Sequence, residues 1–151
     1  MSKSNKLKNT LLKSHTAPLN SDSAFSEQVA GNHYKKLKIQ PILEYIKSVK
    51  PVEFVIVTNG SYKSSEWWTQ LGSVLDSGDT VHFSIDGYDH DSNNLYRVNS
   101  NWDSIMQGMQ TLRQSSECVI TWAAIAFKFN ERHLDLMQAI ALDNGADIFQ
   151  I

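Results

Sequence analysis

Polar side chains follow three apolar runs, at the points where strands are expected to end. The runs are FVIVTNG (54–60), TVHFSIDG (80–87) and VITWAAIAFKFN (119–130). Alternation along the second run places Ser84 and Asp86 on its polar face, and the other two runs end in Asn59 and Asn130. Binding sites of parallel α/β folds lie beyond the carboxyl ends of the strands. We therefore expect a polar site where these ends meet.

Other residues that could do chemistry have ordinary structural roles as alternatives. His82 lies on the polar face of the second run and could act as a base, although a hydrogen-bonded interior histidine is the more common role. The acidic loop after Gly87 begins like a calcium loop, but Asn94 and Ser100 stand where its glycine and glutamate are required. The chain has no glycine-rich phosphate loop, nucleophile elbow or paired-histidine zinc motif, so neither a kinase nor a classical methyltransferase is supported.

Helical patterns separate the apolar runs, as a parallel sheet requires. The expected helices bury three stripes: Trp68, Leu71, Val74 and Leu75; Trp102, Ile105, Met109 and Leu112; and Leu134, Met137, Ile140 and Ala141. A long loop (88–100) precedes the second helix, the third strand extends over 119–129, and 147–151 begins a fourth strand. We expect an α/β fold with a parallel sheet of three to four βα units that does not close into a barrel. At least one strand edge then needs the N-terminal segment or another subunit to cover it.

Length and composition limit the kind of protein. With 151 residues and 41% apolar content, the chain has room for about one domain with a real core. Its single cysteine, Cys118, excludes an internal disulfide and any cysteine-ligated iron–sulfur or zinc site made by this chain alone, and we expect no metal site. No run approaches the roughly 20 apolar residues of a membrane span, and no signal peptide is present, so we expect no membrane association and a cytoplasmic protein.

Charge is divided unevenly along the chain. Residues 1–50 carry nine lysines and three acidic residues, whereas 51–151 carry five basic and thirteen acidic residues. We expect residues 1–26 to form a flexible, partly disordered basic tail and 27–50 a helical segment with Pro41 in its first turn. The tail either keeps the chain in solution or binds nucleic acid or an acidic surface.

Two stretches resemble known families. Residues 28–46, which include GNHYKKLKIQPILEYI, resemble the opening of a small uncharacterised family of phage proteins. The pieces VTNG, FSIDG, YRVN, NWDSIMQGM and WAAIAFKFNERHLDLMQAIA occur in the order found in the second half of radical S-adenosylmethionine enzymes. That resemblance spans about 55–151 and implies an incomplete, half-barrel version of the family fold over 51–151. The family's C-x-x-x-C-x-x-C cluster motif is missing.

The radical S-adenosylmethionine resemblance implies a binding site. By resemblance, Ser84 and Asp86 lie near the ribose, Arg97 pairs with the methionyl carboxylate, and Asn59 and Asn130 offer polar contacts at neighbouring strand ends. A two-pronged arginine–carboxylate pair gives the assignment of Arg97 a physical basis. The ordinary alternatives are a turn at Asp86 and a surface ion pair of Arg97 with a loop aspartate.

Two functions follow as expectations. The first is a phage-type domain that binds S-adenosylmethionine or a related nucleoside as cofactor but, with one cysteine, cannot generate a radical on its own. The second is a non-enzymatic phage interaction protein whose half barrel is a scaffold and whose basic arm binds a host protein or nucleic acid. In either case a partner chain or self-association could complete the barrel.

Overall fold

A computed structural model describes residues 39–151 of the chain, which include four parallel strands and five helices. The expected basic tail (1–26) and the first part of the expected helical segment (27–38) lie outside the described residues. The described part of that segment is helical: α3, Ile39–Val49, has Pro41 in its first turn, where a proline needs no hydrogen-bond partner. Leu43 is buried on its inner face.

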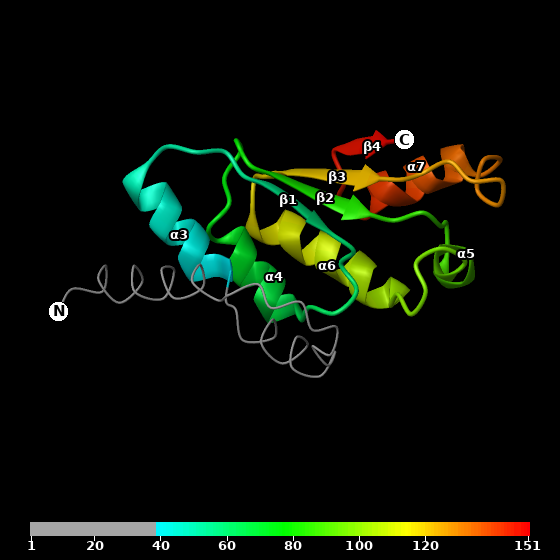
Figure 1. Ribbon diagram of the computed structural model, residues 1–151, viewed down its shortest axis with the longest axis horizontal. Helices are drawn as coiled ribbons and strands as arrows, with labels where there is room; N and C mark the ends of the chain where they lie inside the picture. The colour runs from blue at the N-terminus through cyan, green and yellow to red at the C-terminus, as the bar shows by residue number, and fades with distance from the viewer. Residues whose placement is uncertain (1–38) are drawn as a thin grey trace, which may run out of the picture. The chain divides into compact units, whose positions relative to one another are not determined.

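The four strands form one parallel sheet in the order of the chain (Figure 1). The strands are β1 (Val55–Thr58), β2 (Thr80–Ser84), β3 (Val119–Ala123) and β4 (Ile148–Gln150). Both strand pairs that involve β2 are in parallel register, with Thr80 opposite Val55 on one side and opposite Val119 on the other. The expected α/β class and parallel sheet are therefore confirmed.

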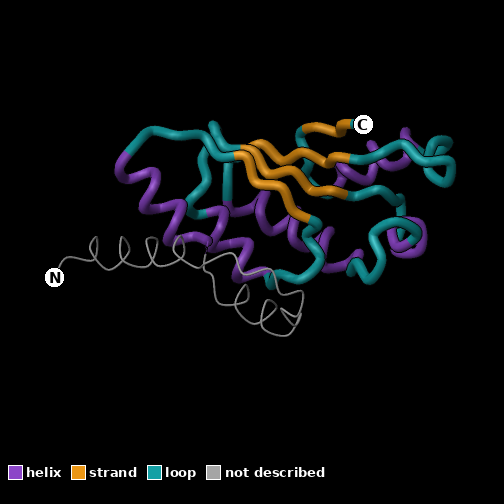
Figure 2. The backbone as a smooth tube through the Cα atoms, viewed as in Figure 1, coloured by secondary structure: helices purple, strands orange, loops and turns teal. Residues whose placement is uncertain are grey.

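The helices that connect the strands cover one face of the sheet (Figures 1 and 2). They are α4 (Ser65–Gly72), α6 (Trp102–Ser115) and α7 (Leu134–Asp143), whereas the short helix α5 (His90–Asn94) lies beyond the carboxyl ends of the strands. Right-handed crossovers between successive neighbouring strands place every connecting helix on the same side, which explains this arrangement. Helix α3 packs on α4, and α4 packs on α6.

The core lies between the helices and the sheet. Val81, Phe83 and Ile85 point from β2 and its end into this layer and are fully buried. The predicted stripes supply most of the helical side: Trp68, Leu71, Leu75, Ile105, Met109, Leu112, Met137 and Ala141 are buried, and Val74, Trp102, Leu134 and Ile140 are partly buried against them. Alternation in the strands and a 3.6-residue period in the helices thus select the same core.

Three boundaries differ from the sequence-based expectation. Strand β3 ends at Ala123, not near Phe129, because Ile125 and Asn130 bond to Asp86 in the segment after β2. The loop 88–100 contains the short helix α5, which Asp89 caps by accepting a hydrogen bond from the Ser92 amide. Helix α4 ends at Gly72, so the segment that leads to Gly78 is a turn.

The other face of the sheet has no helix over it in the described part of the chain. We call it the open face, and alternation and register assign it Val55, Val57, Thr80, His82, Ser84, Val119, Thr121, Ala123, Ile148 and Gln150. Val55 is 68% exposed, Val57 69% and Ile148 47%. Strands in a parallel sheet are normally covered on both faces, so this apolar exposure is unusual.

None of the helices between Ile39 and Ile151 combines the length and the apolar character that a membrane crossing requires.

Candidate functional site

The turn after β1 presents one of the predicted residues. Asn59 uses its side-chain oxygen to accept a hydrogen bond from the Ser61 amide, at 3.2 Å, and Thr58 accepts one from the Gly60 amide. Gly60 has a φ of +71°, a conformation that favours glycine, and a Cβ there would lie 3.0 Å from the Phe83 ring. This turn leaves Asn59 exposed at the carboxyl edge of the sheet.

Asp86 joins three loops at the carboxyl end of β2. Its side chain is fully buried; one oxygen accepts a hydrogen bond from the Ile125 amide at 2.7 Å, and the other accepts one from Arg97 Nε at 2.6 Å. The structure thus brings together two of the predicted site residues, Asp86 and Arg97, which bond to each other. The alternative partner for Arg97, an aspartate of the following loop, is not the one found.

Asn130 is also buried and also serves this junction. Its side-chain nitrogen donates to the backbone oxygens of Asp86 and Ile125, at 2.7 and 2.9 Å, and its oxygen accepts from the Phe127 amide at 2.7 Å. All polar atoms of this side chain are therefore engaged with the protein. Asn130 fixes the loop after β3 and does not face a ligand cavity in the described structure.

Asn93 is a central residue that the sequence analysis considered only as part of a calcium-like loop. Its side chain is fully buried, accepts hydrogen bonds from the Asp86 and Gly87 amides, and donates to Ser100 Oγ at 2.8 Å. Its signal in the sequence is weak, since asparagine is common in loops of every kind. Only the folded structure shows its role: beyond the end of β2, the Asp86 and Gly87 amides bond to the Asn93 side chain instead of to a neighbouring strand.

A hollow of about 370 Å³ opens at this edge of the sheet. It is lined by Asn59, Ser61, Tyr62, Tyr96, Arg97, Val98 and Ser100. Two of the five predicted site residues, Asn59 and Arg97, therefore lie in its wall, and Asp86 lies behind Arg97. Asn130 does not line it, and Ser84 is half-buried on the open face, opposite Ala123 of β3. The volume falls in the range of small-molecule sites.

Aromatic rings stand along one side of this hollow. Tyr96 is half exposed, lies 5.6 Å from the Arg97 guanidinium and packs on Phe127 with ring centroids 4.5 Å apart. Phe127 in turn stacks on Phe129 at 5.2 Å. Tyr62, which also lines the hollow, donates a hydrogen bond to the Asn99 carbonyl. Rings held in this way can stack on a planar base.

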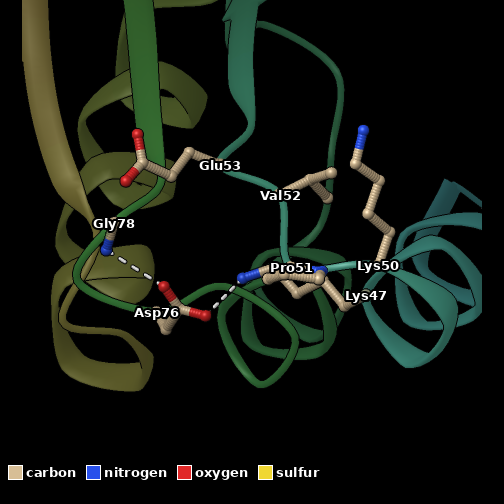
Figure 3. A pocket seen from close by; sticks show the side chains of 7 residues that line it. All are labelled: Lys47, Lys50, Pro51, Val52, Glu53, Asp76 and Gly78. Atoms are coloured by element: carbon tan, nitrogen blue, oxygen red, sulfur yellow. Dashed lines mark hydrogen bonds and ion pairs between the residues drawn. The ribbon is translucent and has the colours of Figure 1, made fainter.

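A second, larger hollow of about 770 Å³ lies at the opposite, amino-terminal end of β1 and β2 (Figure 3). Lys47 reaches across it to Asp76 and Asp79, while Lys50 extends away from Asp76. Burial would lower the pKa of Lys47, but hydrogen bonds and charges from the two aspartates outweigh it and raise the pKa. Hydrogen bonds from Lys47 and the Gly78 amide lower the pKa of Asp76. The ion pairs of Lys47 with Asp76 and Asp79 connect α3 to the start of β2, so the hollow is better explained as a structural joint between these elements.

The described residues offer little for a metal or a cluster. Within 39–151, no three histidine, cysteine, aspartate or glutamate side chains gather closely enough to hold a metal ion. Cys118 is buried and precedes β3, at the end of the sheet opposite to the Arg97 hollow; burial raises the pKa of its thiol. This thiol does not fit a [4Fe–4S] cluster beside the hollow, since such a cluster needs several cysteine ligands.

His82, the candidate base, is half-buried on the open face and pairs in register with Val57 and Thr121. It lies one alternation step below Ser84 and away from the Arg97 hollow, among apolar and hydroxyl-bearing neighbours. No hydrogen bond joins its ring to another residue within 39–151. The described residues therefore support neither the role of a base nor that of a hydrogen-bonded interior histidine.

Comparison of the chain with protein-family models, with curated proteins and with solved structures gives no match in any of the three.

Proposed function

We propose that the Arg97 hollow binds S-adenosylmethionine or a related nucleoside that carries a carboxylate. The observation that carries the proposal is the state of the Arg97 guanidinium. Its Nε is held by the buried Asp86, which fixes the plane of the group, and its two terminal nitrogens have no hydrogen-bond partner within residues 39–151. A guanidinium oriented in this way can bind a carboxylate through both terminal nitrogens.

The rest of the hollow complements the remaining parts of such a ligand. Tyr62 and Tyr96 supply rings on which an adenine can stack, and Asn59 supplies an amide for a ribose hydroxyl. Because Asp86 already neutralises Arg97, recognition depends on hydrogen-bond geometry more than on net charge. The chain itself supplies no cysteine cluster, so the proposal is for binding without radical chemistry by this chain alone.

Calorimetric titration of the full chain with S-adenosylmethionine and, separately, with adenosine tests the proposal. Arg97→Lys keeps a charge beside Asp86 but loses the planar pair of donors, so we expect its affinity for S-adenosylmethionine to fall about tenfold. Its affinity for adenosine, which has no carboxylate, should stay the same. Arg132→Ala, an exposed arginine outside the hollow, is the matched control.

The outcomes separate binding from folding. Arg97→Ala is expected to weaken binding further, but it leaves Asp86 buried without its ion pair, so circular dichroism must first show that the variant is folded. A folded wild-type chain that binds neither ligand contradicts the proposal. Equal losses for both ligands in Arg97→Lys would contradict the assigned contact with the carboxylate.

A second candidate function is a non-enzymatic interaction protein whose basic arm binds a host protein or nucleic acid. The uneven charge favours it, because nine of the chain's fourteen basic residues lie within 1–50. Binding of single-stranded oligonucleotides that weakens with salt and is lost on deletion of 1–26 would support this function. Binding unchanged by the deletion would contradict the role of the arm.

A further inference from the structure

The sheet ends in two edges that are complementary to each other. Within the described residues β1 pairs only with β2 and β4 only with β3, so each outer strand leaves a row of backbone amides and carbonyls unpaired on its far side. All four strands run in the same direction. An outer edge of β4 can therefore continue the sheet in parallel register with the β1 edge of another copy.

Helix α3 gives each strand its own helix. The order α3β1, α4β2, α6β3, α7β4 makes four helix–strand units, and the helices pack in the same sequence, with α3 on α4 and α4 on α6. Gln40 donates a hydrogen bond to the Trp67 carbonyl of α4, and Lys47 donates one to Asp79, which directly precedes β2. Helix α3 thus lies on the far side of α4 from α6 and extends past the amino-terminal end of β1 (Figure 1). This is the side of the helical layer on which a helix would accompany a further strand paired with β1.

The exposed side of α3 agrees with such a position. Ile42, Tyr45 and Ile46 are only half-buried, although they belong to the apolar stripe of the helix. A helix that packs on one neighbour alone leaves part of its stripe exposed, whereas one between two neighbours buries it.

The open face has the composition of a barrel interior. Its side chains are small or β-branched for the most part, and none carries a fixed charge. Val55 and Val57 are among the most exposed apolar residues of the described chain. Branched apolar residues fill the interior of eight-stranded parallel barrels, and eight strands leave just enough room for side chains to fill it.

We propose that two copies of this chain associate edge to edge, β4 of each beside β1 of the other, and close an eight-stranded parallel barrel with both open faces inside. The two-fold axis then runs along the barrel, both seams are identical, and no edge remains unpaired, so the assembly stops at two copies. Parallel closure also brings the carboxyl ends of all strands, and with them both Arg97 hollows, to the same mouth.

The mass of the full chain in solution tests the assembly. Sedimentation equilibrium is expected to give twice the chain mass of 17.1 kDa. Val57→Lys places a charge on the open face and is expected to reduce the mass to that of one chain. Leu95→Lys is the matched control: Leu95 is 66% exposed against 69% for Val57, but lies at the end of α5, away from both seams, and should leave the mass unchanged.

Amide hydrogen exchange distinguishes edge pairing from two sheets stacked face to face. In a closed barrel the peptides that contain β1 and β4 are protected in wild type and exchange faster in Val57→Lys, while β2 and β3 change less. Circular dichroism confirms that the variants are folded. Neither sedimentation nor hydrogen exchange requires a nucleoside, so a negative result for the assembly is distinct from a negative result for ligand binding.

Three results would overturn the proposal. A wild-type chain of single mass would mean that the open face is covered by another part of the chain or stays exposed. A dimer whose β1 and β4 amides exchange as fast as in the monomeric variant would indicate face-to-face stacking. A dimer unaffected by Val57→Lys would place the interface elsewhere.

Discussion

At the residue scale, the carboxyl edge depends on side chains that replace missing backbone partners. After β2 and β3 end, the ladder no longer pairs the backbone, and Asp86, Asn93 and Asn130 take its place by bonding to amides and carbonyls of neighbouring loops. These buried polar side chains are tolerated because each of them has hydrogen-bond partners. Arg97 completes the set by pairing with the only buried carboxylate among them.

Replacement of Asn130 tests how much this junction contributes. Asn130→Ala leaves two carbonyls and one amide without their present partner, so we expect the free energy of unfolding to fall by about 2 to 3 kcal/mol. Urea unfolding followed by circular dichroism measures the change. Gln138→Ala, an exposed position on α7, should change it by less than about 0.5 kcal/mol. A loss no larger in Asn130→Ala than in this control would contradict the role assigned to Asn130.

The sequence predicted Asp86 and Asn130 as polar groups at strand ends, because alternation and the ends of apolar runs can be read from the pattern. It could not predict that Asp86 and Arg97, eleven positions apart, bond to each other, because the segment between them includes a short helix with no apolar stripe. Asn93 was missed as a structural residue for the same reason. Contacts made by loops depend on how the loops fold back, which periodicity does not encode.

At the element scale, close packing of the loop after β2 fixes the position of Arg97. A Cβ at Gly87 would lie 2.1 Å from the Asn93 amide nitrogen, which is backbone and cannot move aside cheaply. This close approach, and the capping of α5 by Asp89, hold the short helix against the end of the strand.

Gly87→Ala should therefore lower the free energy of unfolding by about 2 kcal/mol or more. The matched control is Gly78→Ala, whose added Cβ would meet the exposed Glu53 side chain at 3.2 Å. Because that side chain can move, the control should cost little. Thermal unfolding of the two variants provides the comparison, and a Gly87→Ala variant as stable as the control would mean that the loop after β2 is not tightly packed.

Helices and strands were easier to predict than their ends. Helices α4 and α6 begin after Ser64 and Asn101, whose side chains accept hydrogen bonds from the Trp67 and Ser104 amides. The apolar run that includes β3 predicted a longer strand, but hydrophobicity alone does not distinguish a strand from a loop, and Ile125 is 47% exposed. Ile125 and Asn130 bond to Asp86 after β2, a tertiary effect that overrides local propensity.

At the scale of the whole molecule, the sheet is covered on one face and the polar groups meet at one end. The open face and the unpaired edges are consistent with association, while the Arg97 hollow offers a site that does not require it. The uneven charge places most basic residues in 1–50 and leaves the α/β domain acidic. Binding of a ligand's carboxylate group by that domain must therefore come from a local arrangement, and Arg97 provides the one that the geometry favours.

The most direct measurement is an NMR titration of isotope-labelled full chain with S-adenosylmethionine, followed through the Arg97 Nε–Hε signal and the backbone amides. The account predicts shifts confined to Arg97 and to other residues that line the hollow, such as Asn59, Ser61 and Tyr96, with the α3 and α7 amides unmoved. No shift at saturating ligand, or shifts that cluster on the open face while Arg97 stays in place, would contradict it.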